Sequence, residues 1–127
     1  MADEPTKLRF ERDKDFVSSY ANNVQFESTA FDLTLILGQI DQSVSPFFVR
    51  QRNAVTLSWS EIKLVNHFLQ VNLAIHEAAN GSVGVRKDLI PPPFNIPAGL
   101  ENDPEAKIVE ERVNKLREDF IASLEKA

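Results

Sequence analysis

The chain has 127 residues, of which 43% are hydrophobic and 26% are charged, a composition typical of one soluble globular domain. Its formal net charge of -5 argues against binding to nucleic acid or to an anionic membrane surface, and the absence of cysteine excludes disulfides, thiolate metal sites and a cysteine nucleophile. No apolar run reaches transmembrane length and residues 1–4 do not resemble a signal peptide, so we expect a cytoplasmic protein.

The charged residues are unevenly distributed along the chain. Residues 16–85 hold five acidic and three basic side chains in 70 positions, and the other charges lie in the two ends. We therefore predict a charged disordered tail at 1–15, a folded core at 16–85, a Pro-rich linker at 86–102 and a C-terminal helix at 103–127. A core of this size usually needs a crosslink, a metal or a partner subunit. Because cysteine is absent and metal-ligating residues are few, we favour a partner subunit.

Three stretches of the core alternate between apolar and polar residues with the period of a β-strand. The first begins at Tyr20 and the second at Phe31, and we expect Gly38 and residues 41–46 to break the pattern before the third stretch, at 47–57. In the third stretch the alternation predicts one face with Val49, Val55 and Leu57. Arg50 and Arg52 lie on the opposite face, and we expect them to pair with Asp32.

A long helix follows the third strand. Ser58 is a predicted N-cap with Glu61 as its reciprocal partner, and we expect the helix to cover residues 59–79 and end at Asn80-Gly81. The predicted fold class is therefore α+β, with a three-stranded antiparallel sheet followed by one long helix and then a C-terminal helix after the Pro-rich linker.

The apolar residues of the long helix fill an arc of about 200°, twice the stripe that one sheet covers. This surplus predicts either a second subunit or the C-terminal helix on the uncovered part. The predicted interface residues are Leu64, Val65, Phe68, Leu69, Asn72, Leu73, Ile75 and His76.

Asn72 and His76 interrupt this apolar arc and are neighbours on the helix, being four residues apart. One interpretation is a ligand contact or a catalytic imidazole in a pocket. We favour the other interpretation, in which the two side chains are buried and hydrogen-bonded to each other and fix the register of an interface.

Four prolines exclude residues 90–97 from a helix or a central strand. Ile90, Phe94 and Ile96 are predicted to dock this linker on its own domain, although a Pro-rich segment is also a possible ligand for an SH3-like partner. The C-terminal helix begins at Asp103-Pro104 and is expected to pack on its own or a neighbouring subunit, or alternatively to bind another protein. Its apolar stripe consists of Ala106, Val109, Val113, Leu116, Phe120 and Ser123.

Motifs that carry catalytic or cofactor chemistry are missing from the sequence. Four glycines and two histidines do not form a phosphate-binding loop, a histidine metal site or a Ser-His-Asp pattern. We therefore expect no catalytic residue, no cofactor and no metal.

One order of features is shared with a known family: Tyr20-Ala21-Asn22 opens the first strand, Phe31-Asp32-Leu33 the second, and Val55-Thr56-Leu57-Ser58 leads into a helix that ends shortly before Gly81. Over about residues 18–85 the chain resembles a small bacterial family catalogued as domain of unknown function 3467. It departs from that family at Trp59-Ser60, where a proline-led helix start is typical. The resemblance implies a compact strand-strand-strand-helix protein and no catalytic residue. The segment from Tyr20 to Ser28 is also similar to export chaperones of the SecB type, which are oligomers of small sheet-plus-helix subunits.

These observations predict a non-enzymatic, homo-oligomeric interaction or structural domain, most simply a dimer, that binds neither nucleic acid nor membranes. Its tails, including the C-terminal helix, would contact other proteins. The alternatives are a chaperone-like peptide-binding module of the SecB type and a small-ligand binder with His76 in a pocket.

Overall fold

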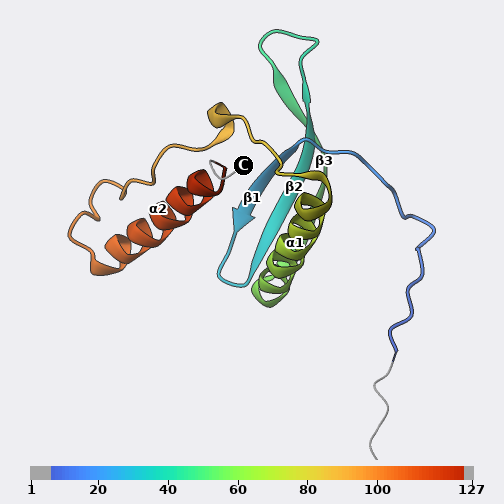
Figure 1. Cartoon of the computed structure of the whole chain (residues 1–127), viewed down its shortest axis with the longest axis horizontal. Coiled ribbons are helices and arrows are strands. Elements are labelled where there is room, and N and C mark those ends of the chain that lie inside the picture. Colours follow the sequence, from blue (N-terminus) through green and yellow to red (C-terminus); the bar gives the residue numbers. More distant parts are fainter. Residues whose placement is uncertain (1–6, 125–127) are drawn as a thin grey trace, which may run out of the picture. The chain divides into compact units, whose positions relative to one another are not determined.

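A computed structural model describes residues 7–124 of the chain. Residues 1–6 of the predicted tail and 125–127 of the C-terminal segment lie outside the described residues. The elements follow the order β1 (Asn23–Ser28), β2 (Asp32–Asp41), β3 (Phe48–Ser58), α1 (Trp59–Asn80), a short 3-10 helix (Lys87–Leu89) and α2 (Pro104–Leu124), as Figure 1 shows. The α+β fold class is confirmed, with the sheet, the long helix and the C-terminal helix in the predicted order.

The chain divides into two compact units, Met1–Val65 and Asn66–Ala127. The first contains the sheet and the start of α1, and the second contains the rest of α1, the Pro-rich segment and α2. The division falls inside α1, whereas the sequence placed the whole of this helix in the core at 16–85.

The sheet is antiparallel in the order β1-β2-β3. Cross-strand partners share a face, so one face is apolar and carries Val24, Phe26, Leu33, Leu35, Leu37, Val55 and Leu57. The other face is mainly polar. On it the hydroxyls of Thr34 and Thr56 are hydrogen-bonded at 2.8 Å, and Gln51 Nε2 donates to Gln25 Oε1 at 3.1 Å.

The first strand begins at Asn23, three residues later than the alternation from Tyr20 predicted. The N–H of Asn22 still donates to the carbonyl of Gly38 at 3.0 Å. However, the next ladder donor, the N–H of Ile40, is bound by the Asn22 side-chain oxygen at 2.8 Å. The backbone ladder ends here because a side chain replaces the backbone acceptor.

The prediction that Gly38 breaks the second strand is wrong, because β2 continues through Gly38 to Asp41. The register shifts at this point, where Leu37 pairs with Asn53 and Gly38 pairs with Gln51. The extra residue on β3 is a β-bulge, which reverses the alternation of β3 beyond it. Val49 therefore pairs with Ile40 on the mainly polar face, and the prediction that it shares a face with Val55 and Leu57 is wrong.

Glycine is required at position 38 by the close approach of β3. A Cβ atom there would lie 2.8 Å from Val49 Cγ1 and 3.0 Å from the Arg50 carbonyl oxygen. We predict that Gly38→Ala lowers the free energy of unfolding by about 1–3 kcal/mol, as expected for overpacking. Denaturant titration measures this loss. Gly84→Ala is the matched control, because no atom lies within 4 Å of the added Cβ. Equal effects of the two substitutions would contradict this account of the bulge.

The start and end of α1 agree with the sequence prediction. Ser58 Oγ accepts the N–H of Glu61 at 3.2 Å, which makes Ser58 the N-cap, and Trp59 Nε1 donates to the carbonyl of Thr29 at 3.0 Å. At the other end Gly81 has a φ of 89° and its N–H donates to the carbonyl of Glu77 at 2.9 Å. Of the two capping bonds expected between the described residues Ser58 and Glu61, only the one to the Ser58 hydroxyl is formed. The reciprocal bond from the Glu61 carboxylate is not formed.

Because only the Ser58 hydroxyl caps this end, Ser58→Ala should cost about 1 kcal/mol of unfolding free energy. Ser60→Ala, two residues away and exposed, should be neutral or slightly stabilising because alanine has the higher helix propensity. Urea titration of both variants tests the cap. If Ser58→Ala were as stable as the wild type, the cap would carry no stability.

Burial is low throughout both units. Among the described residues no hydrophobic side chain is buried, and the central strand β2 is half-buried except at Gly38, which is buried. Neither α1 nor α2 contains a buried residue. No helix in the described part of the chain has the length and apolar character needed to cross a membrane.

Candidate interaction surface

Helix α1 carries two apolar stripes. Placing residues at about 100° per step puts Ile62, Val65, Leu69 and Leu73 on one side of the helix, called here the 62–73 stripe. The second, the 64–78 stripe, has the heptad spacing of four, three, four and three residues and consists of Leu64, Phe68, Val71, Ile75 and Ala78. Its four large side chains are 40% to 64% exposed.

The eight predicted interface residues are divided between these two stripes. Leu64, Phe68 and Ile75 lie on the 64–78 stripe, and the others lie on or beside the 62–73 stripe. Val65 is half-buried and the other seven are exposed. The predicted interface residues do not include Val71 and Ala78, which complete the heptad spacing of the 64–78 stripe.

The predicted hydrogen bond between Asn72 and His76 is not formed. Asn72 Nδ2 donates to the carbonyl of Phe68 at 2.8 Å, and Asn80 Nδ2 donates to the carbonyl of His76 at 3.1 Å. A helical side-chain amide always has the carbonyl four residues earlier within reach, and this local acceptor replaces the side-chain partner. Both residues are exposed, so the single chain does not bury His76.

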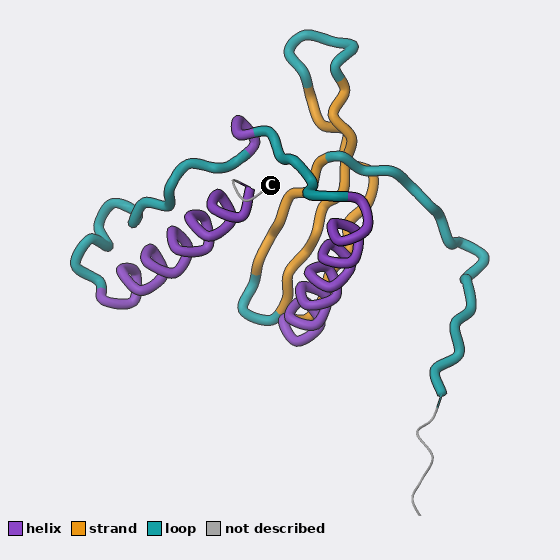
Figure 2. The backbone as a smooth tube through the Cα atoms, in the orientation of Figure 1, coloured by secondary structure: helices purple, strands orange, loops and turns teal. Residues whose placement is uncertain are grey.

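The Pro-rich segment lies along α2, as the backbone trace in Figure 2 shows. Asn114 binds both backbone groups of Phe94: its Oδ1 accepts the N–H at 2.8 Å and its Nδ2 donates to the carbonyl at 3.1 Å. Glu110 Oε2 accepts the N–H of Ile96 at 3.1 Å, and Arg117 Nε donates to the carbonyl of Pro91 at 2.8 Å.

The linker was predicted to dock on its own domain, and the structure shows it docked on the C-terminal helix α2 of the same chain. Ile90, Phe94 and Ile96 are half-buried, whereas the prolines between them are exposed. Docking leaves one face of α2 occupied by the linker and the opposite face open.

Asn114→Ala removes both hydrogen bonds to Phe94, each worth about 1 kcal/mol net. We predict that hydrogen exchange of the Phe94 amide accelerates by about tenfold or more. Exchange measured by NMR tests this, with Asn95→Ala as a control at an exposed neighbouring position. Unchanged exchange in Asn114→Ala would show that the linker is held by its apolar side chains alone.

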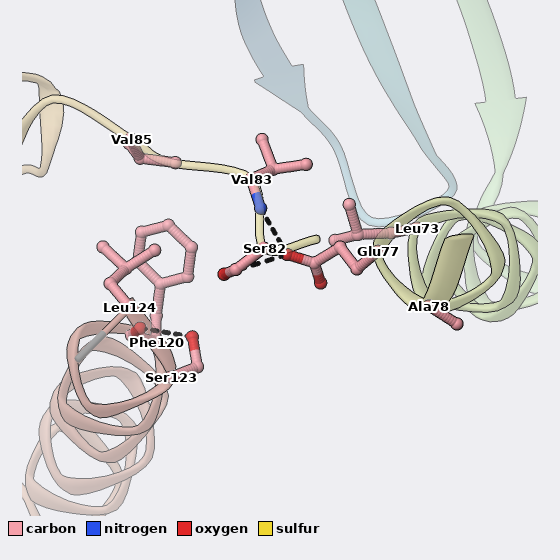
Figure 3. A pocket seen from close by; sticks show the side chains of 9 residues that line it. All are labelled: Leu73, Glu77, Ala78, Ser82, Val83, Val85, Phe120, Ser123 and Leu124. Atoms are coloured by element: carbon pink, nitrogen blue, oxygen red, sulfur yellow. Dashed lines mark hydrogen bonds between the residues drawn. The ribbon is translucent and has the colours of Figure 1, made fainter. Parts of the chain in front are cut away.

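An open groove of about 610 Å³ lies in the second unit, between the last turns of α1 and α2. Leu73, Val83, Phe120 and Leu124 supply apolar side chains to it (Figure 3). Its carboxylate, Glu77, already accepts the N–H of Val83 at 2.7 Å and the hydroxyl of Ser82 at 3.4 Å. The groove is thus an apolar surface whose charged group is bound by the protein's own donors.

A polar cluster occupies the far end of the β2–β3 hairpin. Asp41 accepts the hydroxyl of Ser43 at 2.5 Å and its N–H at 2.9 Å, and these bonds lower the pKa of Asp41 below its usual range. Arg50 is 3.9 Å from Asp41, whereas Asp32 accepts the Thr29 hydroxyl at 2.8 Å. The prediction that Arg50 pairs with Asp32 is therefore wrong, because the bulge and the register place Arg50 near the opposite end of the strand.

The described residues contain no group of three or more His, Cys, Asp and Glu side chains that could hold a metal ion. Comparisons of the chain with models of protein families, with curated proteins and with solved structures give no match.

Proposed function

We propose that this protein is a non-enzymatic, homo-oligomeric interaction domain, most simply a two-fold dimer, in which the 64–78 stripe of α1 forms a subunit interface. One observation carries the proposal: this stripe has coiled-coil spacing and is exposed, in a chain whose described residues include no buried hydrophobic side chain. A heptad stripe requires a second helix, because its side chains insert between those of a facing helix.

A second copy of this chain suits the stripe because the residues beside it are uncharged. At the flanking positions α1 carries Val65, Asn72 and Ala79 on one side of the stripe, and Ser60, His67 and Ala74 on the other side. No Asp, Glu, Lys or Arg occupies these positions, so two α1 helices can approach without repulsion between like charges.

The energy available from this stripe is comparable with the cost of association. Full burial of a Val, Leu, Ile or Phe side chain contributes about 1.5–3 kcal/mol, so four side chains that are about half exposed retain about 3–6 kcal/mol per subunit. Association costs about 4–15 kcal/mol. A stable oligomer therefore needs further surface in addition to the 64–78 stripe.

Phe68→Asp is expected to dissociate the oligomer, because it places a charge in the centre of the stripe. Light scattering should then give the mass of one 14.3 kDa chain. Gln70→Asp adds the same charge two residues away in the polar sector of α1 and should leave the oligomer intact. A wild-type mass of one chain at micromolar concentration would refute the proposal.

The groove in the second unit favours a chaperone-like or peptide-binding module as the alternative function. In that case part of the apolar surface stays open for a client, as the resemblance to SecB-type chaperones implies. An oligomer that binds little of a hydrophobic dye supports the assembly domain, and one that binds the dye strongly supports the peptide-binding module. A small molecule that co-purifies with the protein would instead support a small-ligand binder.

A further inference from the structure

Helix α2 has an exposed apolar stripe that faces neither a strand nor the linker, and the last turn of this stripe, at Phe120, also lines the groove beside α1. Val109, Val113, Leu116 and Phe120, the 109–120 stripe, are 38% to 70% exposed and repeat with spacings of four, three and four residues. Ala106 and Ser123 extend the pattern by one position at each end. With six positions in heptad spacing, this stripe also requires a facing helix.

Charged residues flank this stripe on both sides, whereas the residues that flank the 64–78 stripe of α1 are uncharged. In heptad terms Glu110 and Arg117 lie on the flank nearer the linker. Arg112 and Asp119 lie on the other flank, with Glu105 one heptad earlier. The order of these charges discriminates between the possible partners and orientations.

In an antiparallel pair with full overlap, Val113 faces Leu116 of the second copy and Val109 faces its Phe120. This register brings Arg112 opposite Asp119 of the second copy, and Glu110 opposite its Arg117. Both contacts join opposite charges, and the two-fold symmetry makes each of them twice.

A parallel pair in register gives the opposite result. There each flanking residue faces the residue five positions later in the other helix, so Glu105 faces Glu110 and Arg112 faces Arg117. Both contacts join like charges. A pairing of α2 with α1 offers no opposite charge to Arg112 or Asp119, because the flanks of the α1 stripe are uncharged.

The flanking side chains keep groups free for such contacts. Glu110 uses one carboxylate oxygen for Ile96, and Arg117 uses its Nε atom for Pro91, which leaves the second oxygen and the two terminal guanidinium nitrogens. Asp119 uses Oδ1 for Lys115 at 2.9 Å and is 61% exposed.

We infer that α2 pairs antiparallel with α2 of a second copy, about a two-fold axis close to Asn114 and Lys115. The inference rests on the proposed homo-oligomer and adds a second contact surface to it, on a helix that the 64–78 stripe does not include. The docked linker lies beside this interface, on the flank with Glu110 and Arg117.

Disulfide trapping tests the orientation, since the chain has no cysteine of its own. In the antiparallel pair, Ala106 of one copy lies opposite Ser123 of the other. An oxidised mixture of Ala106→Cys and Ser123→Cys proteins should therefore give a crosslinked dimer, whereas neither variant alone should. Crosslinking of Ala106→Cys by itself would show a parallel pair and overturn the inference.

Charge reversal tests the flanks. Asp119→Arg sets two pairs of like charges against each other and should raise the dissociation constant by about tenfold or more. The double substitution Arg112→Asp with Asp119→Arg exchanges the charges and should restore association. Glu118→Arg makes the same charge change on the outer side of α2, and Lys115→Ala removes the intrahelical ion pair, and neither should have this effect.

The outcomes separate this inference from the proposed function. A wild-type oligomer that gives no mixed crosslink and does not respond to Asp119→Arg would overturn the α2 pairing and leave the homo-oligomer standing. A wild-type chain that is monomeric at all concentrations would overturn both.

Discussion

A three-stranded sheet can shield only one stripe of a helix, and the organisation of this chain depends on that limit. Helix α1 has two apolar stripes along its 22 residues, and no hydrophobic side chain among the described residues is buried. Ile62 and Val65, in the part of α1 that belongs to the unit with the sheet, are only half-buried. The 64–78 stripe stays exposed in the single chain. We propose that a second helix covers it, as its heptad spacing predicts.

In the second unit, α2 is partly covered by the Pro-rich segment of the same chain. The Pro-rich segment has few backbone hydrogen bonds of its own. Its backbone groups at Pro91, Phe94 and Ile96 are bound by α2 side chains, in that order by Arg117, Asn114 and Glu110. This uses one face of α2 and leaves the 109–120 stripe exposed on another. Both helices thus combine a face used within the chain with a heptad stripe that is free for assembly, and we propose that the same oligomer uses both.

The sequence predicted the elements well because their signals are local. The N-cap at Ser58, the stop at Gly81 and the start of α2 at Asp103 each depend on residues within one turn of the helix end. The side of the sheet on which Val49 lies was not predictable, because one bulged residue opposite Gly38 reverses the alternation. The predicted Asn72–His76 hydrogen bond is not formed, because the Asn72 amide donates to the carbonyl of Phe68 in its own helix, as the Asn80 amide does to that of His76. The residues that hold the linker were missed because Glu110, Asn114 and Arg117 have the pattern of an ordinary polar helix face.

The dependence of stability on protein concentration tests the proposed oligomer most directly. If the apolar residues are buried between subunits, folding and association are coupled. Denaturant titration followed by circular dichroism, at chain concentrations spanning about three orders of magnitude, is the measurement. Coupled folding of a dimer predicts that the denaturant midpoint rises steadily with chain concentration. The apparent free energy of unfolding should rise by about 4 kcal/mol over that range. A cooperative transition whose midpoint is the same at every concentration would show that the single chain is stable alone, and would contradict the account.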